Sequence, residues 1–139
     1  LQDLRLVPIV TRKRLHLNAC GDFTLMHRDR WFDVRGHPEW AMYSMHLDSV
    51  LCTCAHYAGA RERVLPERVY HIEHARGSGW SPEGERALYD RLASKGVPVL
   101  EHDRFHRWAV QMRRERRPLI FNEPDWGLAW RELPETVVV

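Results

Sequence analysis

Three groups of residues in this sequence are of types that can do chemistry. Asp48 stands inside an apolar segment, where a carboxylate either acts as a general base or simply caps a helix or faces solvent. A second carboxylate, Asp22, directly follows a glycine. His71 and His74 lead into Gly77-Ser78-Gly79, whose backbone N–H groups could approach a phosphate. Acid–base, metal and phosphate chemistry are therefore the classes to consider.

The two histidines stand three residues apart, which places them on opposite faces of a strand but on one face of a helix. We expect a strand here. On that interpretation one histidine, at the strand end beside the glycine loop, reaches an anionic ligand or a metal, while the other packs or hydrogen-bonds within the fold. The alternative is that both histidines are structural.

A third candidate is a basic segment near the C-terminus. Six arginines there could follow a phosphate backbone, although the aromatic residues among them fall on the stripe expected of a core face. We therefore expect a solvated basic face. The arginines are Arg104, Arg107, Arg113, Arg114, Arg116 and Arg117.

Local patterns predict the elements that would position these residues. Strands are expected over 4–10, 18–26 and 64–72, the last broken by Pro66. Helices are expected over 27–32 with Asp29 near its start, 42–58 with Gly59 at its end, 81–95, and 103–117 closed by Pro118. The aromatic tail over 122–127 should pack on the body of the protein.

Composition narrows the class of protein. The 139 residues suit a single domain, and 44% hydrophobic with 29% charged residues exclude collagen-like and largely disordered chains. A net charge of +2 is too small to imply a nucleic-acid partner, and three cysteines favour a reduced, cytoplasmic compartment. No apolar run or leader pattern suggests a membrane span. Because the sequence begins Leu1-Gln2 without Met, we expect a piece of a longer protein.

The order of the motifs carries a resemblance. Residues 18–26 (NACGDFTLM), 31–39 (WFDVRGHPE), 46–48 (HLD) and 70–74 (YHIEH) with 77–79 (GSG) together resemble the acceptor-side, C-terminal half of a GT-A type nucleotide-sugar glycosyltransferase of the bacterial family 2 kind. The match covers a little under half of the chain. It implies an α/β fold, α+β as an isolated piece: the C-terminal part of an αβα sandwich, with 1–80 as the acceptor-side catalytic portion and 81–139 as a helical extension.

The resemblance also implies residue roles. Asp48 matches the position of the catalytic base, and the histidine that helps to hold metal and diphosphate is His74, with His71 as its competitor. Trp31, Trp40 and Trp80 could form an apolar platform for an acceptor sugar, although packing in the core is the more usual fate of tryptophan. The residues expected to bind substrate are Asp22, His37, Glu39, Ser78 and Trp80.

The implied cofactor is Mn²⁺ or Mg²⁺, with the donor-side ligands outside this chain because it lacks the family's Asp-x-Asp motif. The implied partners are a nucleotide-sugar donor and a glycan or lipid-linked acceptor, with no specific nucleic acid. We expect a cytoplasmic enzyme of polysaccharide synthesis in peripheral contact with the inner face of the membrane, and we expect this chain to be inactive without its missing half.

Two other classes stay open. A metal-dependent hydrolase could assemble Asp22, Asp48, His71 and His74 around one ion, and it would bind zinc with this chain alone. A non-catalytic nucleic-acid module could use the 104–117 segment, and its affinity would fall steeply with salt.

Overall fold

The structure is a computed structural model that describes residues 15–17, 23–68, 70, 84–128, 131–132 and 134. This part of the chain is mainly helical. It contains four helices and one isolated parallel β-bridge, Tyr43 to Val99. The helices are α1 (Arg28–Val34), α2 (Leu47–Tyr57), α3 (Glu85–Ser94) and α4 (His102–Glu115).

The predicted strands are not confirmed. Residues 23–26, 64–68 and 70 belong to no strand and are mostly exposed, so the strand prediction is wrong there. The other positions of the three expected strands lie outside the described residues. An αβα sandwich therefore has no support from the part of the chain that the structure describes.

Local signals place α1, α4 and the end of α3 well. The expected helix over 27–32 is α1, and His27 caps it, since His27 Nδ1 accepts from the Asp29 backbone N–H at 3.3 Å. Helix α3 begins at Glu85, later than the expected start at 81, and ends at Ser94, before Gly96 in the left-handed region. Helix α4 ends at Glu115 and is followed by Arg116 at φ 52°. Its predicted inner stripe is confirmed: Phe105 and Met112 are buried, and Trp108 and Ala109 are half-buried.

Helix α2 begins five residues later than the sequence predicted. Tyr43 is held against Val99, where its N–H donates to Pro98 O at 2.8 Å, and this contact keeps the chain out of helix. His46 then adopts a left-handed backbone conformation, φ 66°, which no residue inside a right-handed helix has. A tertiary contact thus sets the first residue of α2, Leu47.

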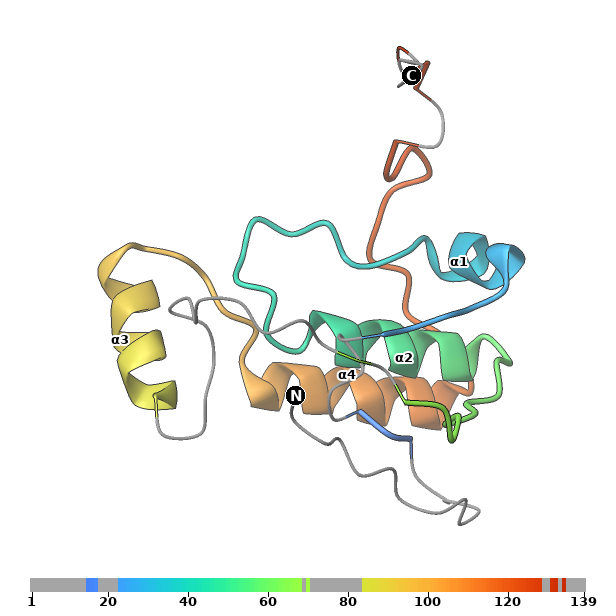
Figure 1. The fold of residues 1–139 in the computed structure, drawn as a ribbon, viewed down its shortest axis with the longest axis horizontal. Helices are drawn as coiled ribbons and strands as arrows, with labels where there is room; N and C mark the ends of the chain where they lie inside the picture. The colour runs from blue at the N-terminus through green and yellow to red at the C-terminus, as the bar shows by residue number, and fades with distance from the viewer. Residues whose placement is uncertain are drawn as a thin grey trace.

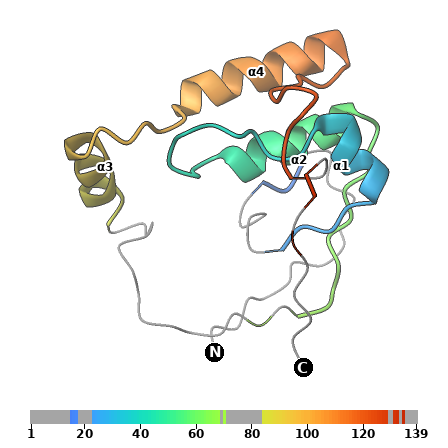
Figure 2. The same cartoon turned by 90° about the horizontal axis from the view of Figure 1, so that it is seen from above.

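The core lies between α2 and α4. Both helices start shortly after the Tyr43–Val99 bridge and run side by side in the same direction in both views (Figures 1 and 2). Cys54 of α2 contacts Met112 of α4 and donates to Leu119 O at 3.3 Å. Helix α1 packs on α2 and contributes Val34, while α3 stands apart from the pair. None of the helices in the described ranges is long and apolar enough to cross a membrane.

Candidate functional site

The loop over 35–39 follows α1 and carries the first predicted site residues. Arg35 and Gly36 both have positive φ, 55° and 68°, so the chain reverses sharply. Asn122, which is buried, holds the turn: its Nδ2 donates to Arg35 O at 2.7 Å and to His37 O at 2.6 Å, and its Oδ1 accepts from Glu39 N at 2.8 Å. Arg35 returns a hydrogen bond to Asn122 O at 2.8 Å. The loop is therefore fixed by one side chain from the C-terminal segment.

The same C-terminal segment packs on the loop a second time. Trp126 lies edge-on to Phe32 with ring centroids 5.6 Å apart, and its ring covers Gly36 so closely that a Cβ there would stand 2.6 Å from Cζ3. The Gly127 N–H donates to Glu39 Oε1 at 2.8 Å. Glu39 is thus held at both its backbone and its carboxylate, although the residue itself is exposed.

Glu39 lines a shallow pocket of about 310 Å³. Its wall is aromatic: Trp40 and Trp108 have ring centroids 5.3 Å apart, and Phe121 touches both at 5.1 and 4.8 Å. The guanidinium of Arg104 lies over the Trp108 ring, 4.9 Å from its centroid. The pocket is lined by Glu39, Trp40, Ala41, Met42, Arg104 and Trp108.

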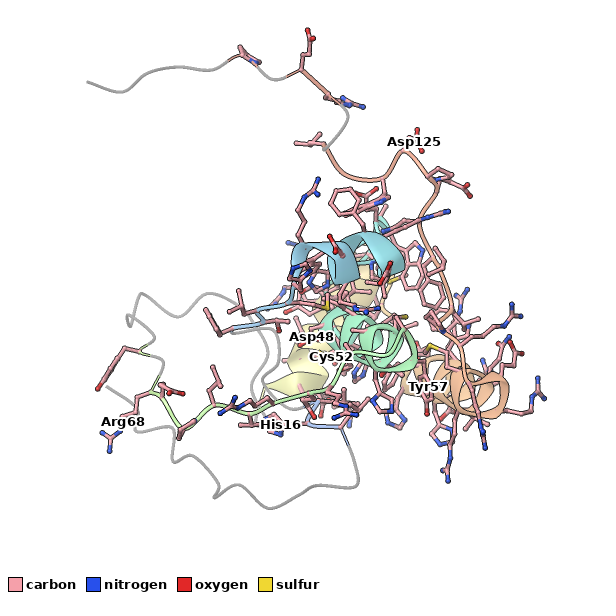
Figure 3. The ribbon with its side chains drawn as sticks, turned by 90° about the vertical axis from the view of Figure 1, so that its right-hand side faces the viewer. His16, Asp48, Cys52, Tyr57, Arg68 and Asp125 are labelled. Carbon is pink, nitrogen blue, oxygen red and sulfur yellow. The ribbon has the colours of Figure 1, made fainter. Side chains whose placement is uncertain are left out.

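Asp48 lies in the first turn of α2 and is half-exposed. Its Oδ1 accepts from the Ser49 N–H at 2.8 Å. Asp48 and Cys52 are one turn apart on a face of α2 that does not face α4 (Figure 3). The pocket is lined by Arg104 and Trp108 of α4 and by no residue of α2, so Asp48 is not part of its lining.

His46 separates the start of α2 from the start of α4. Its ring stacks on Phe105 at 5.9 Å and lies edge-on to His102 at 5.8 Å. Burial lowers the pKa of His46, and the neighbouring His102 lowers it further, while Asp48 and Glu85 act in the opposite direction. A neutral imidazole next to a helix-terminal carboxylate can accept a proton.

No protein-family model matches the chain, and no curated protein or solved structure is significantly similar to it.

Among the other predicted site residues, His37 is exposed, with its ring 5.9 Å from that of Trp31. Trp31 and Trp40 both pack against the hydrophobic core, and Trp40 also lines the pocket. Glu39 and Trp40 both line the pocket, and Asp48 does not. The remaining predicted site residues lie outside the described residues: Asp22, His71, His74, Ser78 and Trp80.

Nothing in the described ranges fits the implied metal. No group of three or more His, Cys, Asp or Glu side chains there could hold an ion. The predicted ligands His71 and His74 lie outside the described residues.

Sequence reasoning missed three residues. Asn122 holds the loop over 35–39 by hydrogen bonds to residues that lie 83 to 87 positions away in the sequence. The only local signal for this role was its place in the aromatic tail over 122–127. Arg104 lies on the exposed face and Trp108 on the inner stripe, as the sequence predicts, but their contact was not predicted. Their spacing of four residues puts them on one helix face, which is the signal that could have paired them.

Proposed function

We propose that this chain is the acceptor-side part of a nucleotide-sugar glycosyltransferase, with Asp48 as the base that activates the acceptor hydroxyl. The order of the motifs supports the assignment. The placement of Asp48 is the observation that carries it: the carboxylate is half-exposed in the first turn of α2, outside the core that α2 forms with α4.

On the acceptor side, the reaction needs a group that takes a proton from the acceptor hydroxyl. A carboxylate takes the proton of an acceptor hydroxyl, whose oxygen then forms a bond to the anomeric carbon of the donor sugar while the bond to the nucleoside diphosphate breaks. Asp48 is half-buried in the first turn of α2, and a carboxylate there has the chemistry of a proton acceptor. The donor and any metal would be held by residues outside the described part.

The loop over 35–39 supports the same proposal. The resemblance assigns His37 and Glu39 of this loop to substrate binding. Here Asn122 and Gly127 hydrogen-bond to the loop, and His37 and Glu39 are exposed. A loop that is held by such contacts and presents polar side chains to solvent is suited to positioning a substrate.

The test is Asp48→Asn in the natural protein, including any residues that precede Leu1. Asn keeps the Oδ1 that accepts from Ser49 but cannot take a proton. We expect turnover to fall by about 10²-fold or more, within the roughly 10²–10⁴-fold contribution of a general base, while the melting temperature stays near that of the parent. The measurement is nucleoside diphosphate release with a panel of nucleotide sugars and glycan acceptors, in Mn²⁺ or Mg²⁺.

Asp90→Asn is the matched control, because Asp90 is exposed on α3. It should leave turnover unchanged. Turnover by Asp48→Asn within a few-fold of the parent would remove Asp48 from the mechanism. If the parent releases no nucleoside diphosphate with any donor, the proposed function itself is wrong.

A further inference from the structure

The pocket between the 39–42 segment and α4 has the composition of a sugar site. Trp40 and Trp108 are half-buried, and Phe121 supports both rings from a third direction. Rigid indole rings that are partly open to solvent offer an apolar surface to the C–H face of a pyranose. At about 310 Å³ the space is at the lower end of the roughly 300–1,000 Å³ of small-molecule pockets, which suits one sugar ring.

Two charged groups flank this aromatic wall. The Arg104 guanidinium is held over Trp108, and no carboxylate of the described residues pairs with it. Glu39 uses Oε1 for Gly127 and accepts no hydrogen bond at Oε2 from the described part of the chain. A guanidinium supplies only donors and a carboxylate only acceptors, so together they match hydroxyl groups, each of which does both.

The two charges also select the ligand. Glu39 and Arg104 have opposite signs, so the pocket lining is neutral as a whole. A carboxylate or phosphate on the ligand would gain from Arg104 but would be repelled by Glu39. The balance favours an uncharged, hydroxyl-rich ring.

We propose that this pocket is an accessory subsite for one neutral hexopyranose unit of the acceptor glycan. The assignment of this sugar to the acceptor rests on the proposed function, but the binding of a sugar in the pocket does not. Since Asp48 does not line the pocket, the pocket would hold a sugar other than the one that reacts. Its effect on transfer would therefore be on acceptor affinity and not on the chemical step.

The binding experiment uses methyl hexopyranosides as probes. Two-dimensional NMR of the chain should show shifts of the indole N–H signals of Trp40 and Trp108, assigned from Trp40→Phe and Trp108→Phe, with dissociation constants in the millimolar range typical of ligands this small. Arg104→Gln and Glu39→Gln should each weaken binding several-fold. The Gln at position 39 keeps an oxygen for Gly127, so the loop should be retained.

Arg107→Gln is the matched control, since Arg107 is an exposed arginine of the same helix outside the pocket. It should leave the binding constant unchanged. Indole shifts that are absent, or that survive Arg104→Gln unaltered, would overturn the proposal. Tighter binding of methyl hexuronides than of the neutral glycosides would overturn it too, because the balance of charge would then not set selectivity.

The kinetic arm separates this inference from the proposed function. In an active natural protein, Arg104→Gln should raise KM for an oligosaccharide acceptor and leave kcat unchanged, whereas Asp48→Asn should lower kcat. An unchanged KM would reject the subsite while glycosyl transfer stands. Sugar binding without any transfer activity would support the pocket as a sugar site and reject the proposed function.

Discussion

At the scale of single residues, the loop over 35–39 depends on Asn122 and Gly36. Asn122 satisfies two carbonyls and one N–H that would otherwise lack partners in a partly buried turn. Such groups cost about 1–3 kcal/mol each when left unpaired, so this one side chain accounts for much of the rigidity of the loop. Glu39 owes its position to that rigidity.

Gly36 allows the close approach of Trp126. Gly36→Ala should destabilise the fold by about 1–3 kcal/mol, because the new methyl group strains a positive φ and also collides with the ring at Cζ3. Gly59→Ala is the control: Gly59 has φ 92° but nothing within 4 Å, so it reports backbone strain alone. The free energies of unfolding from urea titrations should differ, with the larger loss at Gly36.

A double variant checks the cause. If the collision matters, adding Trp126→Ala to Gly36→Ala should cost less than Trp126→Ala costs in the parent. Equal losses for the two glycine variants, or strict additivity with Trp126→Ala, would show that the contact between Gly36 and Trp126 is not what the loop needs.

Residue types allowed Asp48 to be singled out, because a carboxylate inside an apolar segment is visible in the sequence, whereas Glu39 was singled out by the resemblance. They did not reveal Asn122. Its hydrogen bonds join positions 83 to 87 residues apart, and no local pattern encodes a contact of that range. The pairing of Trp40 with Trp108 and Phe121 was invisible for the same reason.

At the scale of elements, the sequence predicted the helices because their signals are local. The stripe of α4, the glycine after α3 and the small apolar residues of α2 each lie within a few turns. The start of α2 was placed wrongly because it depends on the Tyr43–Val99 bridge and on the left-handed His46. That start also holds Asp48, so the error fell within the candidate site.

His46 makes the joint between α2 and α4 sensitive to acid. Its pKa is below the ordinary 6.5, chiefly through burial and then through His102, so near pH 6 the folded state binds fewer protons than the unfolded state. Its contribution to stability is therefore intact above about pH 6.5 and is lost as the pH falls through the lowered pKa. His46→Asn, which tolerates the left-handed backbone, should lose less stability than the parent between about pH 7.5 and pH 5.5.

The loss of stability on acidification is measured by thermal unfolding, followed by circular dichroism, at a series of pH values. His106→Asn controls for removal of a histidine, since His106 is exposed on α4. The His106 variant should retain the acid sensitivity of the parent. If His46→Asn retains it as well, the joint between the two helices is not the source.

At the scale of the whole molecule, the expected α/β sandwich stays a prediction. A helix satisfies its own backbone, whereas a strand needs a partner, and most of the residues expected to form strands lie outside the described part. The described strand partners, Tyr43 and Val99, are 56 residues apart and form only a single bridge. Sequence patterns indicate a strand's residues but not its neighbour, and this limited the fold prediction.

The arginines on α4 and just after it determine whether this helix could bind nucleic acid. Six arginines are exposed on α4 or just after it, yet Arg114 and Arg117 both pair with Glu115, at 3.4 and 2.9 Å, and Arg104 lies over Trp108. The hydrogen bond from Arg117 is the main cause of the lowered pKa of Glu115. Because these arginines are partly engaged and the net charge is only +2, we expect the helix not to be a dedicated phosphate-binding surface.

Binding to labelled duplex and single-stranded oligonucleotides should therefore be non-specific, with dissociation constants on the order of 10⁻⁴ to 10⁻⁶ M at physiological salt. Titration at two salt concentrations measures it, and the paired changes Arg113→Glu and Arg114→Glu should weaken this binding no more than Arg61→Glu with Arg63→Glu, two exposed arginines away from α4. Affinity near 10⁻⁸ M that persists at physiological salt and is lost only with the α4 pair would instead make α4 a nucleic-acid reader. That result would overturn the interpretation of α4 as a solvated basic face and would favour a nucleic-acid-binding module instead.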